Sequence, residues 1–87
     1  MASEYVKSKT RVHLTSGQSV RIAREMLKWS QNELAKHSGL AQTTISGIEA
    51  DRIQMGVDRA KKLARALKLH PAVLLFPDWD VEKESVA

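Results

Sequence analysis

The sequence contains no cysteine among its 87 residues, so it can form neither a disulfide bond nor a thiolate metal site. Its three histidines, His13, His37 and His70, are far apart and follow no spacing that metal ligands use. We therefore expect a chain that binds no metal and carries no cofactor.

Long apolar runs and catalytic motifs are missing as well. No apolar stretch approaches the ~18 residues of a membrane-spanning helix, and no signal-peptide pattern opens the chain. The sequence has no glycine-rich phosphate loop, no G-x-S-x-G motif and no pair of acids placed for general acid–base catalysis. These absences predict a cytosolic protein that is not an enzyme and has no membrane partner.

Acidic residues are scarce until the last part of the chain. The net charge is +4, yet the segment after Pro77 carries a net −3, which leaves +7 for the chain before it. A basic body attracts phosphate-bearing partners over a long range and releases counterions when it binds them. The charge balance therefore favours a nucleic-acid partner, although a lysine-rich solubilising surface gives the same balance.

Size and patterning divide the chain into three parts. A domain of this length has a thin core, which a partner subunit helps to stabilise. Residues 1–15 alternate apolar or β-branched residues with basic ones, which predicts either an edge strand or a basic arm that reaches a DNA backbone. Residues 16–77 form the predicted domain, and residues 78–87 form an acidic tail.

Residues 29–52 give the strongest local signal. Ser30, with Glu33 three residues later, forms a capping box that predicts a helix over residues 31–38. Gly39 supplies the left-handed conformation that often ends a helix, and a second helix is expected over residues 42–50. This second helix has an apolar stripe and an opposite stripe of small or uncharged polar residues: Gln42, Thr43, Ser46 and Gly47. A helix of this kind suits a surface that reads bases.

The pattern S-Q-x-E-L-A-x-x-S-G-L-x-Q-x-T-I-S-x-I-E spans residues 30–49. It resembles the helix-turn-helix of the phage-repressor (Cro/CI, or XRE) family of DNA-binding domains, in side-chain types, in spacing and in the turn glycine. With its flanks, the resemblance covers roughly residues 17–76. It implies an all-α, five-helix domain of the lambda-repressor-like type. The chain departs from the family at Asp51, where members usually have glycine.

The resemblance also implies a sequence-specific regulator of transcription that binds double-stranded DNA. We expect a repressor that acts as a homodimer on a near-palindromic operator. An antitoxin that has a toxin protein as its partner is a further role open to such a domain. The alternatives are a protein-interaction adaptor on the same fold and a nucleic-acid binder without sequence choice.

The helix-turn-helix stretch supplies the expected DNA contacts. Gln42 is the best candidate for reading a base, because its amide can bond N6 and N7 of adenine together. The other expected base contacts come from its polar neighbours, Thr43 and Ser46. The expected phosphate contacts are Gln31, Thr44 and Arg52.

Three more helices are expected around this motif. The first spans residues 17–28, with Ser16 as its cap, and its inward residues are Val20, Ala23 and Leu27. Ile22 and Met26 form a second, flanking pair on it. The other two helices span residues 57–67, with Val57 inward, and residues 71–76. The family resemblance implies an ion pair between Arg24 of the first helix and Glu49 of the base-reading helix.

The last helix and the residues after it carry more apolar groups than one face of a short helix can bury. An exposed apolar patch more often marks a subunit interface than a free surface. We therefore expect a homodimer interface built from Leu74, Leu75, Phe76 and Trp79. The alternative is that all of these side chains cap the core of the monomer.

Overall fold

The computed structural model describes residues 13–78, and within this range the chain forms five helices and no strand. The helices are α2 (Ser16–Met26), α3 (Gln31–Ser38), α4 (Gln42–Glu49), α5 (Gly56–Leu67) and α6 (Pro71–Leu75). The expected all-α, five-helix architecture is confirmed. The predicted N-terminal arm or strand covers residues 1–15, of which residues 1–12 lie outside the described part of the chain.

The start of α2 corrects one sequence prediction. Its cap is Thr15, whose hydroxyl accepts the N–H of Gln18 at 3.1 Å, while the Gln18 side chain accepts the N–H of Thr15 at 2.9 Å. Such a reciprocal capping box needs glutamine or glutamate three residues after the cap, and Thr15 meets this condition whereas Ser16 does not. The prediction of Ser16 as the cap is wrong.

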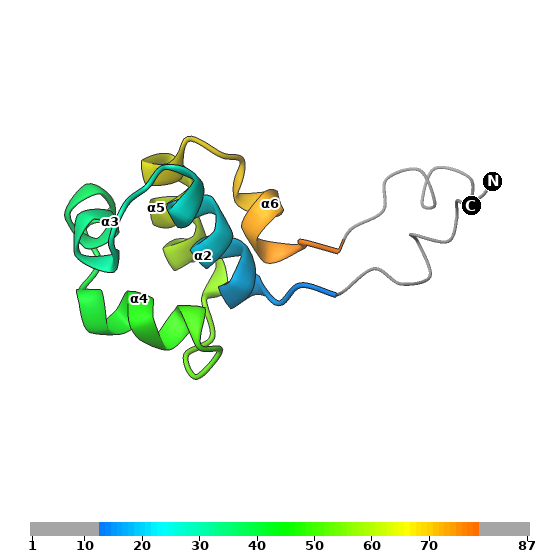
Figure 1. Cartoon of the computed structure of the whole chain (residues 1–87). Helices are drawn as coiled ribbons and strands as arrows, with labels where there is room; N and C mark the ends of the chain where they lie inside the picture. Colours follow the sequence, from blue (N-terminus) through cyan, green and yellow to red (C-terminus); the bar gives the residue numbers. More distant parts are fainter. Residues whose placement is uncertain (1–12, 79–87) are drawn as a thin grey trace, which may run out of the picture.

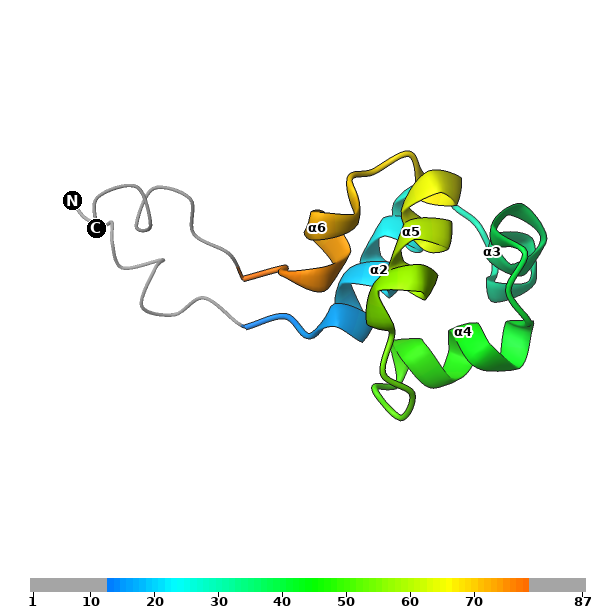
Figure 2. The same cartoon turned by 180° about the vertical axis from the view of Figure 1, so that it is seen from behind.

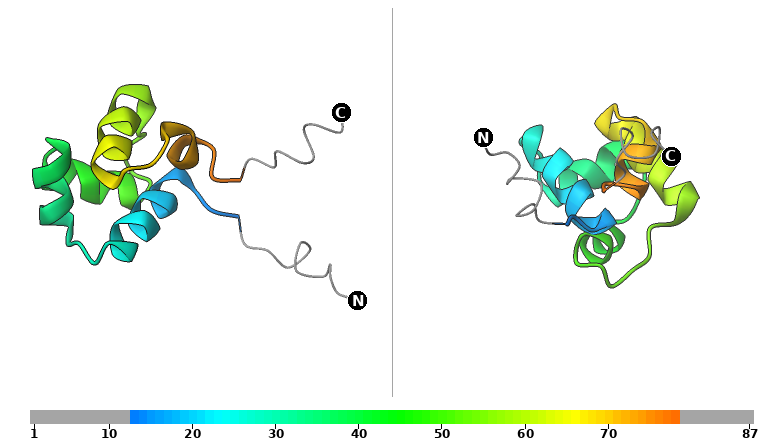
Figure 3. Two further views of the ribbon diagram at one scale, coloured as in Figure 1. Left: turned by 90° about the horizontal axis from the view of Figure 1, so that it is seen from above. Right: turned by 90° about the vertical axis from the view of Figure 1, so that its right-hand side faces the viewer.

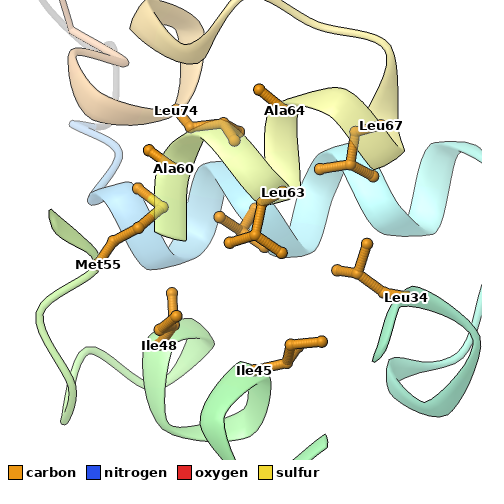
Figure 4. Packing of buried hydrophobic residues seen from close by; sticks show 10 residues of the cluster. Leu34, Ile45, Ile48, Met55, Ala60, Leu63, Ala64, Leu67 and Leu74 are labelled. Carbon is orange, nitrogen blue, oxygen red and sulfur yellow. The ribbon is translucent and has the colours of Figure 1, made fainter. Parts of the chain in front are cut away.

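The core gathers apolar side chains from all five helices. The largest fully buried side chains are Val20, Leu34, Ile45, Ile48, Leu63 and Leu74. Figure 4 shows the labelled members pointing into a common space from α3, α4, α5 and α6, with Met55 joining them from the loop before α5. Burial of these side chains supplies the main driving force that holds the helices together.

Three apolar side chains lie elsewhere than the sequence predicted. Leu74 was assigned to a dimer interface, but it is 0% exposed in the core of the monomer, because α6 packs on both α2 and α5. The prediction is wrong for this residue. Leu27 and Val57 were expected to point inward and are instead 44% and 57% exposed. Leu27 directly follows the last residue of α2 and Val57 is the second residue of α5, so both lie at helix ends that extend beyond the core.

Three helices end on a non-glycine residue in the left-handed conformation. Lys28, Asp51 and Lys68 have φ values of 61°, 60° and 60°. After each of them the next N–H reaches back to a helix carbonyl, in the bonds Trp29 to Arg24 (3.2 Å), Arg52 to Gly47 (2.8 Å) and Leu69 to Ala64 (2.9 Å). These are Schellman motifs, which usually place glycine at this position.

The start of α2 packs closely on the end of α4. A methyl group at Gly17 would lie 2.1 Å from the carbonyl oxygen of Ile48, so a larger residue cannot fit without a backbone shift. The Asp51 carboxylate crosses the same junction, where it accepts the N–H of Gly17 at 3.2 Å and the hydroxyl of Thr15 at 2.7 Å. The junction therefore fixes α4 relative to α2.

The two ends of the described chain lie side by side at one end of the molecule, away from α3 (Figures 1 and 2). Asp78 accepts the backbone N–H of Leu14 at 3.2 Å and lies 3.3 Å from Nδ1 of His13. The view from above also shows the two ends of the described chain close together (Figure 3, left). In Figure 1, α4 runs along the lower edge of the bundle, away from the chain ends.

Candidate nucleic-acid interface

The predicted helix-turn-helix consists of α3, the turn after it and α4. The Ser30 hydroxyl accepts the N–H of Glu33 at 3.1 Å, and the Glu33 carboxylate accepts the N–H of Ser30 at 2.6 Å. Gly39 ends α3 with a φ of 80°. The capping box and the turn glycine therefore set the boundaries of α3 as the sequence predicted.

A bidentate ion pair joins α2 to α4 beside this motif. Nε of Arg24 donates to Oε2 of Glu49 at 2.8 Å, and Nη2 donates to Oε1 at 3.0 Å. The remaining Nη1 donates to the backbone carbonyl of Trp29 at 2.7 Å. The two side chains are only 11% and 5% exposed. The hydrogen bond to Glu49 raises the pKa of Arg24, against the lowering effect of burial, so the guanidinium stays charged.

Two glutamine amides extend the ion pair to the surface of α4. Nε2 of Gln31 donates to Oε1 of Glu49 at 3.0 Å, and Nε2 of Gln42 donates to Oε1 of Gln31 at 2.7 Å. Because a carboxylate can only accept, Glu49 fixes which way the Gln31 amide points, and the Gln31 oxygen then fixes the Gln42 amide. Gln42 keeps its Oε1 and one N–H for another group.

The predicted base-reading side chains share one face of α4. Thr43 is exposed, while Gln42 and Ser46 are half-buried. Residues at this helical spacing point to the same side, which here is opposite to the buried Ile45 and Ile48. The exposed part of this face carries no charged side chain, because Glu49 at its end is almost buried.

Gly47 was interpreted as part of this outer face, and that interpretation is wrong. The position is buried because Ile53, from the loop after α4, folds over it, and a methyl group on Gly47 would lie 2.4 Å from Cδ1 of Ile53. The N–H groups of Arg52 and Ile53 both bond to the Gly47 carbonyl, at 2.8 and 3.1 Å. The loop therefore shortens the outer face of α4 to Gln42, Thr43 and Ser46.

The residues predicted to contact phosphate are spread over the motif. Gln31 is the first residue of α3, and its amide is held in the hydrogen-bond chain from Glu49 to Gln42. Thr44 is half-buried in α4, and Arg52 is exposed in the loop that follows. The structure thus brings Gln31 to the predicted base-reading face and places Arg52 at the opposite end of α4.

Sequence reasoning missed two contributions to this surface. Gln31 was expected to contact phosphate, and its link to Gln42 follows only from the packing of α3 on α4. Asp51 was noted as a departure from glycine, but no sequence pattern indicates that it bonds to Thr15 and Gly17. Both contributions depend on contacts between separate helices.

Among the described residues, no helix has the length and apolar character that crossing a membrane requires. Residues 13–78 contain no group of three or more side chains of the metal-binding types that could hold an ion.

Comparison with known proteins places this geometry in a family. A family model described as helix-turn-helix, HTH_3, matches residues 20–74. The chain belongs to this helix-turn-helix family, of the Cro/CI (XRE) type. The family and its fold are those of DNA-binding regulators of transcription, which are not enzymes.

Two solved helix-turn-helix structures are similar to the chain over most of its described residues. The P22 c2 repressor, solved in complex with a synthetic operator, is 29% identical and has a TM-score of 0.70, and the match covers 76% of this chain and 100% of that one. The restriction–modification controller protein C.AhdI from Aeromonas hydrophila is 33% identical with a TM-score of 0.66. That match covers 69% of this chain and 91% of C.AhdI.

A curated relative is longer than the chain. The HTH-type transcriptional regulator y4dL of Sinorhizobium fredii, itself uncharacterized, is 46% identical over 65 residues. The match covers 75% of this chain and 31% of y4dL. The helix-turn-helix chain thus corresponds to about a third of that relative.

Proposed function

We propose that the chain binds double-stranded DNA sequence-specifically and regulates transcription as a repressor. The observation that carries this proposal is the orientation of the Gln42 amide by the chain of bonds through Gln31 from Glu49. An amide held in this way offers one acceptor and one donor side by side, which is the pattern that matches N6 and N7 of adenine. The side chain is ordered before DNA arrives, so binding requires little further ordering.

The surroundings of Gln42 support the same function. The N-terminus of a recognition helix is the part that reaches base edges in the major groove, and Gln42 is the first residue of α4. The N-terminus of α3 offers backbone N–H groups to a phosphate, and Arg52 offers a positive charge at the other end of α4. Thr43 and Ser46 complete a base-facing surface without charge.

The test is selection of binding sites from a labelled pool of random duplexes. We expect the chain to enrich a near-palindromic sequence. Gln42→Ala should then weaken binding by about 1–3 kcal/mol per half-site and relax the preference at one base pair. Lowering the salt concentration should not restore this preference, because phosphate contacts carry no sequence information.

Arg52→Ala is the matched control for Gln42→Ala. It should weaken binding to all duplexes alike and reduce the slope of log affinity against log salt by about one. Altered base choice in Arg52→Ala, with a uniform loss in Gln42→Ala, would mean that another face binds DNA. Enrichment of no sequence would contradict the proposal. If no duplex binds, the chain is a protein-interaction adaptor; if all duplexes bind equally, it is a general nucleic-acid binder.

We further propose that the repressor is a homodimer that uses the end of α6, at Leu75 and Phe76, and the start of α5. Phe76 is 56% exposed and Val57 is 57% exposed, and Leu75 shares a hollow with Val57 and Arg52 beside the end of α4. A two-fold axis near this hollow would place the two copies of α4 on successive turns of one face of the duplex, about 34 Å apart. Leu74 takes no part in this interface, because it is buried in the monomer. Trp79, which was also assigned to the interface, lies outside the described residues.

The antitoxin role stays a prediction. Its sequence basis was partly the acidic tail, and residues 79–87 of that tail lie outside the described part of the chain. Expression together with the product of the neighbouring gene tests it, since an antitoxin is expected to bind that product and to relieve its toxicity.

A further inference from the structure

An apolar groove lies between α2 and α6, and none of its lining residues is a proposed base or phosphate contact. Its volume is about 330 Å³. It is lined along α2 by Ile22, Ala23 and Met26, with Leu27 at the far end. Leu69 and Val73 form the facing wall. The exposed fractions of Ile22, Met26 and Val73 are 43%, 77% and 50%, so this is the largest gathering of uncovered apolar side chains among the described residues.

Basic side chains flank the far end of the groove. Lys28 directly follows Leu27, and Lys68 lies between the groove residues Leu67 and Leu69. Neither lysine forms an ion pair within residues 13–78. A ligand that suits this groove is therefore a peptide that has apolar side chains along its length and acidic side chains beyond them.

The chain itself contains such a peptide in the segment that follows Pro77, the last groove residue in the sequence. Residues 78–82 read Asp-Trp-Asp-Val-Glu, and Glu84 adds another acid. Pro77 lines the groove, so the tail begins at its edge. We propose that this groove binds the chain's own C-terminal segment, with Trp79 in the groove and Glu82 or Glu84 against Lys28 and Lys68.

The length of the tail suits this arrangement. Trp79 follows Pro77 by two positions, a reach of at most about 7 Å, which keeps the indole beside the groove. Glu82 follows Pro77 by five residues, or about 16 Å of extended chain. The α2 segment from Ser19 to Leu27 is about 12 Å long, so Glu82 can reach its far end.

The tether also favours the chain's own tail over that of a second copy. A segment attached at the edge of its binding site has an effective concentration in the millimolar range, whereas a second copy must reach the groove at its free concentration. The proposal is independent of DNA binding, because the groove shares no residue with the proposed base or phosphate contacts.

Tryptophan fluorescence tests the proposal. The chain has two tryptophans, so Trp29→Phe leaves Trp79 as the only emitter. We expect Trp79 to emit at a shorter wavelength, and to be quenched less by acrylamide, in the folded chain than in the chain unfolded by urea. If Trp29→Phe loses its helical circular dichroism, the difference between the spectra of the unaltered chain and Trp79→Phe gives the same emission.

A groove variant and a matched control locate the binding site. Met26→Glu should move the Trp79 emission to longer wavelength and restore quenching, because it places a charge in the groove at an exposed position. Asn32→Glu adds the same charge at an exposed residue that lies outside both the groove and the proposed dimer surface, and it should leave both unchanged. Lys28→Glu with Lys68→Glu should weaken the protection, whereas Lys61→Glu with Lys62→Glu should not.

The outcomes that overturn the proposal are distinct. Trp79 emission equal to that of the unfolded chain means that the tail does not occupy the groove. Equal effects of Met26→Glu and Asn32→Glu mean that Trp79 is covered elsewhere. Protection that appears only as the protein concentration and the sedimenting mass rise together means that a second copy is the occupant.

Discussion

At Gln42, a neutral amide takes its orientation from a charge that it does not touch. The Glu49 carboxylate is held by Arg24 and accepts from Gln31, and this leaves the Gln31 oxygen facing Gln42. The arrangement places a charged group behind the proposed base-reading surface rather than on it. Glu49 is therefore expected to affect both the stability of the domain and the base preference at Gln42.

Replacement of Glu49 by alanine tests the stability contribution. It leaves the nearly buried Arg24 with one carbonyl partner, and we expect a loss of about 3 kcal/mol in the free energy of unfolding, the lower end of the range for buried pairs. The lower end applies because a surface hollow lined by both side chains admits water. Urea unfolding followed by circular dichroism measures the loss.

The double variant Arg24→Met with Glu49→Leu is the control for an unpaired charge. It should recover much of the stability, since apolar residues of similar volume often replace a buried ion pair at little cost. A double variant no more stable than Glu49→Ala would contradict the interpretation that the unpaired arginine causes the loss.

At the scale of the helix, the ends of α2, α4 and α5 share one backbone conformation but differ in their side-chain contacts. Lys68 makes no side-chain hydrogen bond or ion pair among the described residues, whereas the Asp51 carboxylate accepts two bonds from the start of α2. The conformation itself is unfavourable for both, because the side chain crowds the backbone at positive φ.

Glycine should therefore have opposite effects at these two helix ends. Lys68→Gly should raise the free energy of unfolding by about 0.5–1 kcal/mol. Glycine removes the strain of the left-handed conformation, and part of this gain is offset because the unfolded chain has more conformational entropy with glycine. Asp51→Gly gains the same relief but loses both bonds across the junction of α2 and α4, so we expect a net loss of stability. Thermal unfolding of both variants measures the difference, and stabilisation by Asp51→Gly would show that the junction bonds contribute little.

Much of the helical layout could be predicted from the sequence, because caps and periodicity are local signals. Ser30, Glu33 and Gly39 determine the ends of α3 through contacts a few residues apart. The left-handed ends at Lys28 and Lys68 could not be predicted, since neither residue type favours that conformation.

For the candidate site, the features that depend on packing between separate helices could not be predicted from the sequence. The Arg24–Glu49 pair followed from the family resemblance and is present. The closure of Ile53 over Gly47 and the burial of Leu74 depend on how the loop after α4 and the short α6 settle on the core. Apolar patterning indicates which residues need a partner, and it does not say whether that partner is the same chain.

At the scale of the whole molecule, the proposed homodimer depends on the surface around Phe76 rather than on the groove. Phe76 and Val73 lie on the same short segment, yet only Val73 lines the groove. The two residues therefore allow the dimer surface to be altered separately from the groove.

Phe76→Asp should weaken dimerisation at least about tenfold, an effect of about 1.4 kcal/mol, while the helical circular dichroism stays unchanged. Val73→Asp is the matched control and should leave the dimer intact. Sedimentation equilibrium at micromolar concentration measures both, with and without operator DNA. A chain that is monomeric under both conditions before any substitution would rule out the homodimer.

The bonds of Asp78 to Leu14 and His13 hold the point where the chain enters the domain next to the point where it leaves. A domain with adjacent ends can be inserted into a surface loop of another protein without forcing that loop apart. It can equally be reconnected, with a short linker between residues 13 and 78 and new ends opened in the exposed stretch at Gln54. Such a permuted chain would keep α3 and α4 in one continuous segment. Its helices would follow one another in the order α5, α6, α2, α3 and α4, while their arrangement in space would stay the same.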